Sequence, residues 1–336
     1  MDSRIIDLPG PAVAAAADGT TVWCAAAGLL LAFDRYGSPL GSVPAPPGLR
    51  SLAAAGGALV AAGDVLSWLD PGTGEQRESV PAGPETVVVA GGGAVWAADR
   101  LEQRAWLLPA AGVRGAPLET PGLGQCAADG HRLWWTSRPT DRTAPRPGGD
   151  SRPDGASGPD GGPGPDVGPR SGASLRGGPQ GGTVLHGGRL AVELGPVTAA
   201  AMVVCSGAVW IGAAGTLLSV NAWSGAPGPT LAVGPGSGPV PDALGGSVPN
   251  AGAGSGPDAP GGSGPAGLVA ALACANGAVV GGSPGHGMFV LDPATDQGLW
   301  HVTEEPPGTL GAIIACPPTV WALSADRPAA LVVSLF

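Results

Sequence analysis

The segment PETVVVAGGGAVWAADR, residues 84–100, contains the pattern that decides the fold. A Pro/Gly-rich connection leads into the apolar stretch TVVVA, the pair Gly92-Gly93 follows, and a second apolar stretch begins at Ala94. A two-residue hairpin turn of the primed type needs positive φ at its second position, which glycine adopts without steric cost. The segment therefore predicts two short antiparallel strands, Thr86–Ala90 and Ala94–Ala98. The second strand lacks polar alternation, which indicates a sheet buried on both faces.

The same pattern occurs seven times along the 336 residues. The turn pairs lie at Asp18-Gly19, Gly56-Gly57, Gly92-Gly93, Asp129-Gly130, Ser206-Gly207, Asn276-Gly277 and, in altered form, Pro317-Pro318. Their separations are 38, 36, 37, 77, 70 and 41 residues. A Pro/Gly connection precedes each turn, at Pro9-Gly10, Pro47-Gly48, Gly83-Pro84, Pro121-Gly122, Gly195-Pro196, Gly264-Pro265 and Pro307-Gly308. The turn pair and the Pro/Gly connection recur together at the same spacing, which indicates a repeat architecture.

Each repeat has room for four short strands. In the third repeat, Ala105–Pro109 and Ala116–Thr120 follow the first two as the third and fourth strands. With 61 glycines and 38 prolines the chain is a poor source of long helices. Four-stranded units arranged around an axis form a β-propeller. The sequence therefore predicts an all-β chain, a single seven-bladed propeller domain that spans residues 1–336.

Two low-complexity stretches account for the two long separations. Residues 138–182 are predicted as a disordered loop insertion in blade 4, and residues 234–266 as another between blades 5 and 6, because neither has enough apolar residues to bury. In a propeller, the links between the second and third strands lie on the same face as the links between blades. Both insertions are therefore expected on one face, which becomes the default binding surface.

The two chain ends are expected to complete one blade together. Ala329–Phe336 provides a third strand for the seventh repeat, after which the chain stops one strand short. Arg4–Leu8 is apolar enough to supply the missing outer strand. Such a closure pairs strand edges that would otherwise be exposed.

Charge and cysteine content narrow the class of protein. The chain has no lysine and a net charge of −10, which disfavours nucleic acid and anionic membranes as partners. Residues 1–10 lack the basic start and apolar core of a signal peptide, so a cytoplasmic location is expected. Glycine turns interrupt the apolar stretch 198–221, so no membrane span is expected. The propeller is expected to be monomeric. No CxxC pair occurs among the five cysteines, which are interpreted as small buried thiols of a reducing compartment: Cys24, Cys126, Cys205, Cys274 and Cys316.

The ten tryptophans are expected to be structural. Five occupy the same position of their repeats and are interpreted as spacers between blades: Trp23, Trp96, Trp134, Trp210 and Trp321. Trp135 must face the opposite side of its strand and is expected in the next gap between blades. The remaining four, Trp68, Trp106, Trp223 and Trp300, lie in or near outer strands, where packing is expected rather than ligand stacking.

Candidate functional side chains gather on the insertion face. Glu85, Asp99 and His286 are the catalytic candidates, because they lie in loops that reach that face. The candidates for binding a partner or ligand are Arg50, Arg100, Glu102, Arg104 and Gln125. No GxSxG, HExxH or phosphate-binding loop occurs in the sequence, and no dedicated metal site is predicted. No cofactor is expected, except that Mg²⁺ or Ca²⁺ would serve if the site were catalytic.

The repeat resembles that of the streptogramin lyase and YVTN/quinoprotein-like group of propellers. The matching residues are Asp18-Gly19 with Val22-Trp23, Gly93–Trp96, Leu69–Gly74 and the partial copy Leu291–Thr295. The resemblance covers most of the chain outside the insertions and implies the propeller fold. It also implies a magnesium-dependent lyase with histidine and glutamate near the channel, but no His/Glu arrangement here aligns with that site. Glu75-Gln76-Arg77 follows Thr73-Gly74 where quinoproteins have a docking tryptophan, so quinone binding is not supported.

Two functions from different classes follow. The first is a non-enzymatic scaffold that binds a protein or peptide partner on the insertion face. The alternative is a metal-dependent lyase or hydrolase at the channel mouth, with Glu85, His286 or Asp99 as its active groups. A role in the secondary metabolism of a high-GC bacterium is suggested by composition alone.

Overall fold

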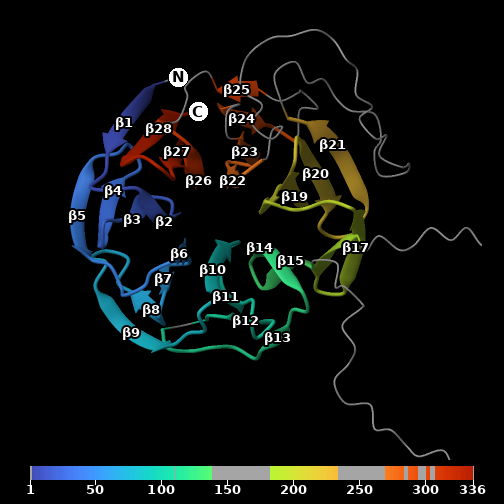
Figure 1. Ribbon diagram of the computed structural model, residues 1–336, viewed down its shortest axis with the longest axis horizontal. Coiled ribbons are helices and arrows are strands. Elements are labelled where there is room, and N and C mark those ends of the chain that lie inside the picture. The colour runs from blue at the N-terminus through green and yellow to red at the C-terminus, as the bar shows by residue number, and fades with distance from the viewer. Residues whose placement is uncertain are drawn as a thin grey trace, which may run out of the picture.

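The chain folds as a ring of seven four-stranded antiparallel sheets (Figure 1). The computed structural model describes residues 2–109, 111–137, 182–233, 269–283, 287–293, 300–302 and 307–335. Within these ranges the chain forms strands and turns only. None of its described segments is a helix long and apolar enough to cross a membrane. The predicted all-β, seven-bladed β-propeller is confirmed.

The first three blades follow the chain in order, from the inner strand to the outer one. Blade 1 contains β2 (Ala12–Ala17), β3 (Thr21–Ala26), β4 (Leu29–Asp34) and β5 (Pro39–Pro44). Blade 2 contains β6 (Ser51–Ala55), β7 (Ala58–Ala62), β8 (Val65–Leu69) and β9 (Gln76–Pro81). Blade 3 contains β10 (Thr86–Gly91), β11 (Ala94–Asp99), β12 (Arg104–Leu107) and β13 (Leu118–Glu119).

The next three blades keep the same order. Blade 4 contains β14 (Leu123–Asp129), β15 (Arg132–Ser137), β16 (Thr183–Gly187) and β17 (Leu190–Gly195). Blade 5 contains β18 (Ala201–Cys205), β19 (Ala208–Ala213), β20 (Thr216–Asn221) and β21 (Pro227–Ala232). Blade 6 contains β22 (Ala271–Ala275), β23 (Ala278–Ser283), β24 (Gly287–Leu291) and β25 (Trp300–Val302).

Blade 7 is built from both ends of the chain. It contains β26 (Leu310–Cys316), β27 (Thr319–Ser324), β28 (Ala329–Ser334) and, as the outer strand, β1 (Ser3–Asp7). β1 pairs antiparallel with β28, from Ser3 opposite Val333 to Asp7 opposite Ala329. The predicted closure by the N-terminal strand is therefore confirmed, and it covers the edge that β28 would otherwise expose.

The decisive hairpin of blade 3 forms as its glycines predict. Gly92 and Gly93 both adopt positive φ, 56° and 81°, and the strands on either side pair from Thr86 opposite Asp99 to Gly91 opposite Ala94. Gly91 itself approaches blade 4 so closely that a Cβ atom there would lie 2.0 Å from the Ala128 carbonyl oxygen. Small residues in the inner strands therefore allow seven blades to meet around one axis.

The core consists of the gaps between neighbouring blades. The repeated tryptophans Trp23, Trp96, Trp134, Trp210 and Trp321 are all buried there, with at most 7 % exposed. Trp68 and Trp135 are buried as well, whereas Trp106 is half-buried. The interpretation of the five repeated tryptophans as spacers is confirmed, and each buries the large apolar surface that dominates core energetics.

Trp223 does not follow the packing expectation for the outer tryptophans, because 76 % of its surface is exposed. It lies in the turn after β20 rather than on a strand, so no neighbouring blade covers it. The side chain of Trp300 lies outside the described residues.

The links between strands define two faces of the ring. The links from the second to the third strand and from blade to blade lie on one face, named the insertion face; the hairpin turns from first to second and third to fourth strand lie on the other, named the turn face. β15 pairs with β16 across residues 138–182, and β21 precedes β22 across residues 233–270. Both low-complexity stretches therefore leave from strand ends on the insertion face, while their predicted disorder lies outside the described residues.

Candidate functional site

A turn capped by a buried side chain follows β11 in blade 3, on the insertion face. Asp99 ends the strand and is buried, with 1 % of its surface exposed. One carboxylate oxygen accepts hydrogen bonds from the backbone N–H groups of Leu101 (2.9 Å) and Glu102 (2.8 Å), and the other accepts one from Thr86 Oγ1 (2.8 Å). The Asp99 carboxylate thus fixes the backbone of the turn and has no free face for a substrate or a metal ion.

Gly83 closes the space over this carboxylate. A Cβ atom at Gly83 would lie 1.9 Å from Asp99 Oδ2, so only glycine fits between the connection and the turn. The sequence placed Asp99 on the correct face but could not show that another loop covers it, because Gly83 and Asp99 meet only in the folded blade.

The capped turn presents three consecutive exposed side chains. Arg100, Leu101 and Glu102 are all exposed, and Leu101 has 61 % of its surface in contact with solvent. Because the Asp99 carboxylate already orders this backbone, a ligand that bound here would pay little for ordering the loop. Leu101 is the residue of this site that sequence reasoning missed; its signal was the Asp-x-x-Glu spacing typical of a side-chain-capped turn.

The other predicted binding residues are distributed over blades 2 to 4. Arg50 donates hydrogen bonds to the backbone oxygens of Gly48 and Gly63 and lies 3.6 Å from the Asp64 carboxylate. Arg104 pairs with Glu119 on the neighbouring strand, with 3.0 Å between Nε and Oε1. Both pairs are solvent-exposed, so each contributes little to stability and leaves its charges accessible.

Glu85 and Gln125 precede or open inner strands, as expected for positions near the channel mouth. Glu85 is exposed just before β10, and Gln125 is half-buried within β14, where its backbone N–H donates to Thr136 Oγ1 (3.0 Å). The structure thus brings Glu85, Arg100 and Glu102 onto one face, without joining them into a catalytic arrangement.

The donor set for a metal ion is incomplete in the described part of the chain. Among the residues that the structure describes, no three His, Cys, Asp or Glu side chains group so as to hold an ion. His286, the histidine of the lyase hypothesis, lies outside the described residues. The residues that are described do not form a magnesium site.

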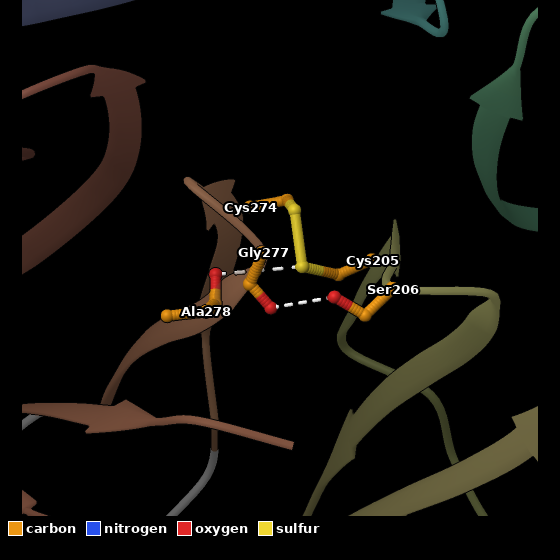
Figure 2. Close-up of a disulfide and its surroundings, with 5 residues drawn as sticks. All are labelled: Cys205, Ser206, Cys274, Gly277 and Ala278. Carbon is orange, nitrogen blue, oxygen red and sulfur yellow. Dashed lines mark hydrogen bonds between the residues drawn. A yellow bond between two sulfur atoms is a disulfide. The ribbon is translucent and has the colours of Figure 1, made fainter. Parts of the chain in front are cut away.

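Two cysteines form a bond that the sequence interpretation did not foresee. Cys205 at the end of β18 and Cys274 in β22 are joined by a disulfide, which links blades 5 and 6 (Figure 2). Beside it, Ser206 Oγ donates to the Gly277 carbonyl oxygen (2.7 Å). The expectation of five free thiols is therefore wrong for this pair. The two cysteines are 69 residues apart, and only the ring geometry brings the ends of adjacent inner strands together.

The remaining three cysteines agree with the interpretation of inert buried thiols. Burial raises the pKa of the Cys24 thiol to about 12 and that of the Cys316 thiol to about 11. Burial also raises the pKa of Cys126 to about 11, although part of this residue reaches the surface. Since the thiolate is the reactive form, none of the three is suited to nucleophilic catalysis near neutral pH.

His186 is the one described histidine with a defined surrounding. Its ring stacks on Trp135 with 5.0 Å between the ring centroids, and its Nε2 lies 3.0 Å from Ser137 Oγ. Burial lowers the pKa of this imidazole below its ordinary value, so the ring is neutral at physiological pH. These contacts give His186 a packing role beside the point where the first insertion begins.

Comparisons with known proteins show the fold but not a family. No family model matches the chain, and no curated protein matches its sequence. One similar solved structure belongs to a crystal structure of the mitotic checkpoint complex, with 9 % identity over 99 % of this chain and 94 % of that chain and a TM-score of 0.63. The β-propeller domain of Cps50 (Swd1) from Myceliophteria thermophila is 11 % identical over the full length of both chains, with a TM-score of 0.58.

A third similar structure bears on the resemblance seen in the sequence. Virginiamycin B lyase from Staphylococcus aureus is 10 % identical over 100 % of this chain and 99 % of that chain, with a TM-score of 0.57. The resemblance to the streptogramin lyase group is therefore confirmed at the level of the propeller fold. Because a propeller hosts many unrelated activities, the function has to be argued from the site.

Proposed function

We propose that this protein is a non-enzymatic propeller scaffold that binds a protein or peptide partner on its insertion face. The observation that supports it most is the turn Arg100–Glu102, an exposed leucine between two opposite charges on a backbone that the buried Asp99 carboxylate holds in place. An exposed apolar side chain with charged neighbours matches the apolar centre and polar rim of a protein interface.

The charges around this turn define the partner. Glu85, Arg100 and Glu102 are exposed on blade 3, and the exposed ion pairs Arg50–Asp64 and Arg104–Glu119 lie on blades 2 and 3. Alternating charges around an exposed leucine suit a polypeptide segment with its own mixed charges and an apolar side chain. The mixed surface disfavours a nucleic acid, whose uniform negative charge would meet several carboxylates.

The test compares two leucines that are equally exposed. Leu101→Ala is expected to weaken binding of the endogenous partner at least fivefold, whereas Leu40→Ala, on the outer strand β5 and 60 % exposed, should leave it unchanged. The measurement is quantitative mass spectrometry of proteins recovered with each immobilised variant, followed by titration of the enriched partner. Equal recovery with Leu101→Ala and wild type would contradict the role of the blade 3 turn.

A second variant addresses the insertions. Replacing residues 138–182 by a short Gly-Ser link should preserve the circular dichroism spectrum, because β15 and β16 already pair on either side of the segment. The scaffold hypothesis predicts that this deletion abolishes partner recovery. Unchanged recovery would count against the scaffold hypothesis.

The metal-dependent lyase or hydrolase remains the alternative, because Glu85 is exposed at the rim and the virginiamycin B lyase fold is similar. Asp99 is a poor candidate for its active groups, since it is buried and its two oxygens already accept three hydrogen bonds from Thr86, Leu101 and Glu102. Calorimetric titration with Mg²⁺, Ca²⁺ and Mn²⁺ decides between the classes. Saturable heat of ion binding in the wild type that is absent from the Glu85→Gln variant would favour the enzyme. The absence of binding heat with all three ions would favour the scaffold.

The cytoplasmic location stays a prediction, and the disulfide offers a way to examine it. In a reducing cytosol Cys205 and Cys274 would be kept as thiols, whereas an oxidising compartment favours the bond. Rapid alkylation of intact cells followed by mass spectrometry of the two peptides measures their state. Alkylated Cys205 and Cys274 are expected for a cytoplasmic protein, and a fully retained disulfide would contradict that location.

A further inference from the structure

A cavity of about 550 Å³ lies on the axis of the ring. Its lining comes from all seven inner strands, three or four consecutive residues each: Ala15–Ala17, Leu52–Ala54, Val89–Gly92, Cys126–Asp129, Met202–Val204, Leu272–Cys274 and Ile313–Ala315. These residues lie toward the hairpin turn in β2, β10, β14 and β26, and they are the three central residues of β6, β18 and β22. The cavity therefore extends from the middle of the channel toward the turn face, whereas the turn proposed for the partner lies on the insertion face.

The side chains around this cavity are almost entirely apolar. Alanine, valine, leucine, isoleucine, methionine and glycine make up the wall, together with Cys126 and the disulfide-bonded Cys274. Among the lining residues that the structure describes, Asp129, exposed at the end of β14, is the one charged residue, and none is an arginine or a histidine. Such a wall gives no binding energy to an anion, and Asp129 together with the net charge of −10 repels one.

The hydrogen-bonding groups of the cavity come from the backbone. Each inner strand forms one edge of its sheet, and these edges surround the axis (Figure 1). On the axial side their N–H and C=O groups therefore have no partner within the sheet. Bonds between adjacent blades satisfy some of them, such as Gly130 N–H to the Gly91 oxygen (2.9 Å). Since backbone groups need partners, the others are left to water or to a ligand.

We propose that this cavity binds an uncharged, mostly apolar small molecule that carries one or two hydrogen-bonding groups. Ligand sites typically have volumes of roughly 300–1,000 Å³ and apolar walls with a few polar groups, often from the backbone. Water in this cavity can bond to the backbone groups but not to the apolar side chains, so a molecule that meets both kinds of surface gains affinity by displacing it. The site does not depend on the partner proposed for the insertion face.

Alanine at position 90 opens part of this volume. Ala90 lines the cavity and is exposed, so its methyl group borders the open space. A phenylalanine there would occupy the cavity without displacing a buried neighbour. The matched control is Ala191, an exposed alanine of the outer strand β17 that does not line the cavity.

The probe is N-phenyl-1-naphthylamine, a neutral apolar fluorophore whose emission increases when it leaves water. Wild type and Ala191→Phe should bind one molecule saturably, and Ala90→Phe at least tenfold more weakly. The charge control is 8-anilinonaphthalene-1-sulfonate, the same ring system with a sulfonate, which should also bind at least tenfold more weakly. Absence of saturable binding of the neutral probe by wild type, or equal affinity of Ala90→Phe, overturns the proposal, as does tighter binding of the sulfonate.

A measurement on the unmodified chain keeps the test decisive if Ala90→Phe does not fold. Cys126 lines the cavity and is partly exposed, whereas Cys24 and Cys316 are buried elsewhere. Saturating N-phenyl-1-naphthylamine should slow the alkylation of Cys126 by N-ethylmaleimide at least fivefold, as measured by peptide mass spectrometry. An unchanged rate at Cys126 would place the probe outside the cavity and overturn the proposal.

Discussion

At blade 7 the ring is completed by hydrogen bonds between the two ends of the chain, whereas at the junction of blades 5 and 6 a covalent bond joins two inner strands. In blade 7, β1 pairs along its whole length with β28, and Leu8 N–H adds a bond to the Pro328 oxygen (2.7 Å). At the other junction, the Cys205–Cys274 disulfide and the Ser206–Gly277 hydrogen bond make the contact (Figure 2).

The difference follows from the chain between the joined elements. Elsewhere a short connection holds neighbouring blades together, but the link from β21 to β22 spans residues 233–270. A long link restrains its ends only weakly, because loop-closure entropy grows with length. The disulfide restrains blades 5 and 6 where their long connection does not. In blade 7 no connection joins β28 to β1, and a complete strand pairing holds the two chain ends together.

The largest expected effect comes from removing the closing strand. A chain that lacks residues 1–8 loses all pairing of β1 and the buried side chains of Ile6 and Leu8. This should remove most of the roughly 5–15 kcal/mol by which a domain is stable, and size-exclusion chromatography should show no folded monomer. A truncated chain that keeps its thermal midpoint would show that closure is dispensable.

Two adjacent isoleucines sharpen this result. Ile6 is buried, whereas its neighbour Ile5 is 59 % exposed on the same strand. Ile6→Ala should cost about 2–5 kcal/mol and Ile5→Ala less than about 0.5 kcal/mol, measured by urea unfolding. Similar costs for the two variants would mean that β1 does not pack on blade 7 as described.

The disulfide is expected to contribute less than the whole closing strand. It closes a loop of 69 residues, and the chain-entropy relation assigns about 4 kcal/mol to a loop of that size. The double variant Cys205→Ala/Cys274→Ala should lose about that amount in chemical unfolding and become insensitive to dithiothreitol. Wild type should fall to the same stability in the reductant, and a reductant effect on the double variant would contradict the assignment.

A smaller difference separates the tryptophans of the two regions. Trp321 Nε1 donates to the Arg35 carbonyl oxygen (3.2 Å), whereas the buried Trp210 Nε1 has no partner. Trp321→Phe should therefore be more destabilising than Trp210→Phe by about 1 kcal/mol. Equal free energies of unfolding would show that the hydrogen bond does not contribute.

The smallest effect is expected from pH. Hydrogen bonds from Ser324 Oγ and from the backbone and hydroxyl of Thr309 lower the pKa of Asp326 in blade 7 to about 2. A lowered carboxyl pKa stabilises the fold above the unfolded value near 4, and that contribution is lost as the pH falls towards 2. Asp326→Asn should therefore flatten the loss of stability between pH 4 and 2. The measurement is the free energy of unfolding between pH 4 and 2, and the same pH dependence in the variant and the wild type would contradict this role of Asp326.

The sequence sufficed for the blade count and the closing strand because both are properties of local chain chemistry. A turn such as Gly92-Gly93 reverses the chain wherever it occurs, and its recurrence counts the blades. Partnerships between repeats were not accessible in the same way. The Cys205–Cys274 pair, the cover of Gly83 over Asp99 and the apolar cavity arise only when inner strands of different blades come together around the axis.

The exposure of Trp223 was not predicted from the sequence, and it makes this residue useful as a fluorescent probe. Asn221 Oδ1 accepts hydrogen bonds from the backbone of Trp223 and Ser224, both at 2.9 Å, so the turn is rigid although its indole faces solvent. The Arg132 guanidinium stacks on that indole at 5.3 Å from the ring centroid. A Cβ atom at Gly207, two residues after Cys205, would lie 4.0 Å from the indole nitrogen. Acrylamide should quench the fluorescence of Trp223 but not that of the buried tryptophans. The emission of Trp223 therefore reports on the disulfide-linked junction of blades 5 and 6.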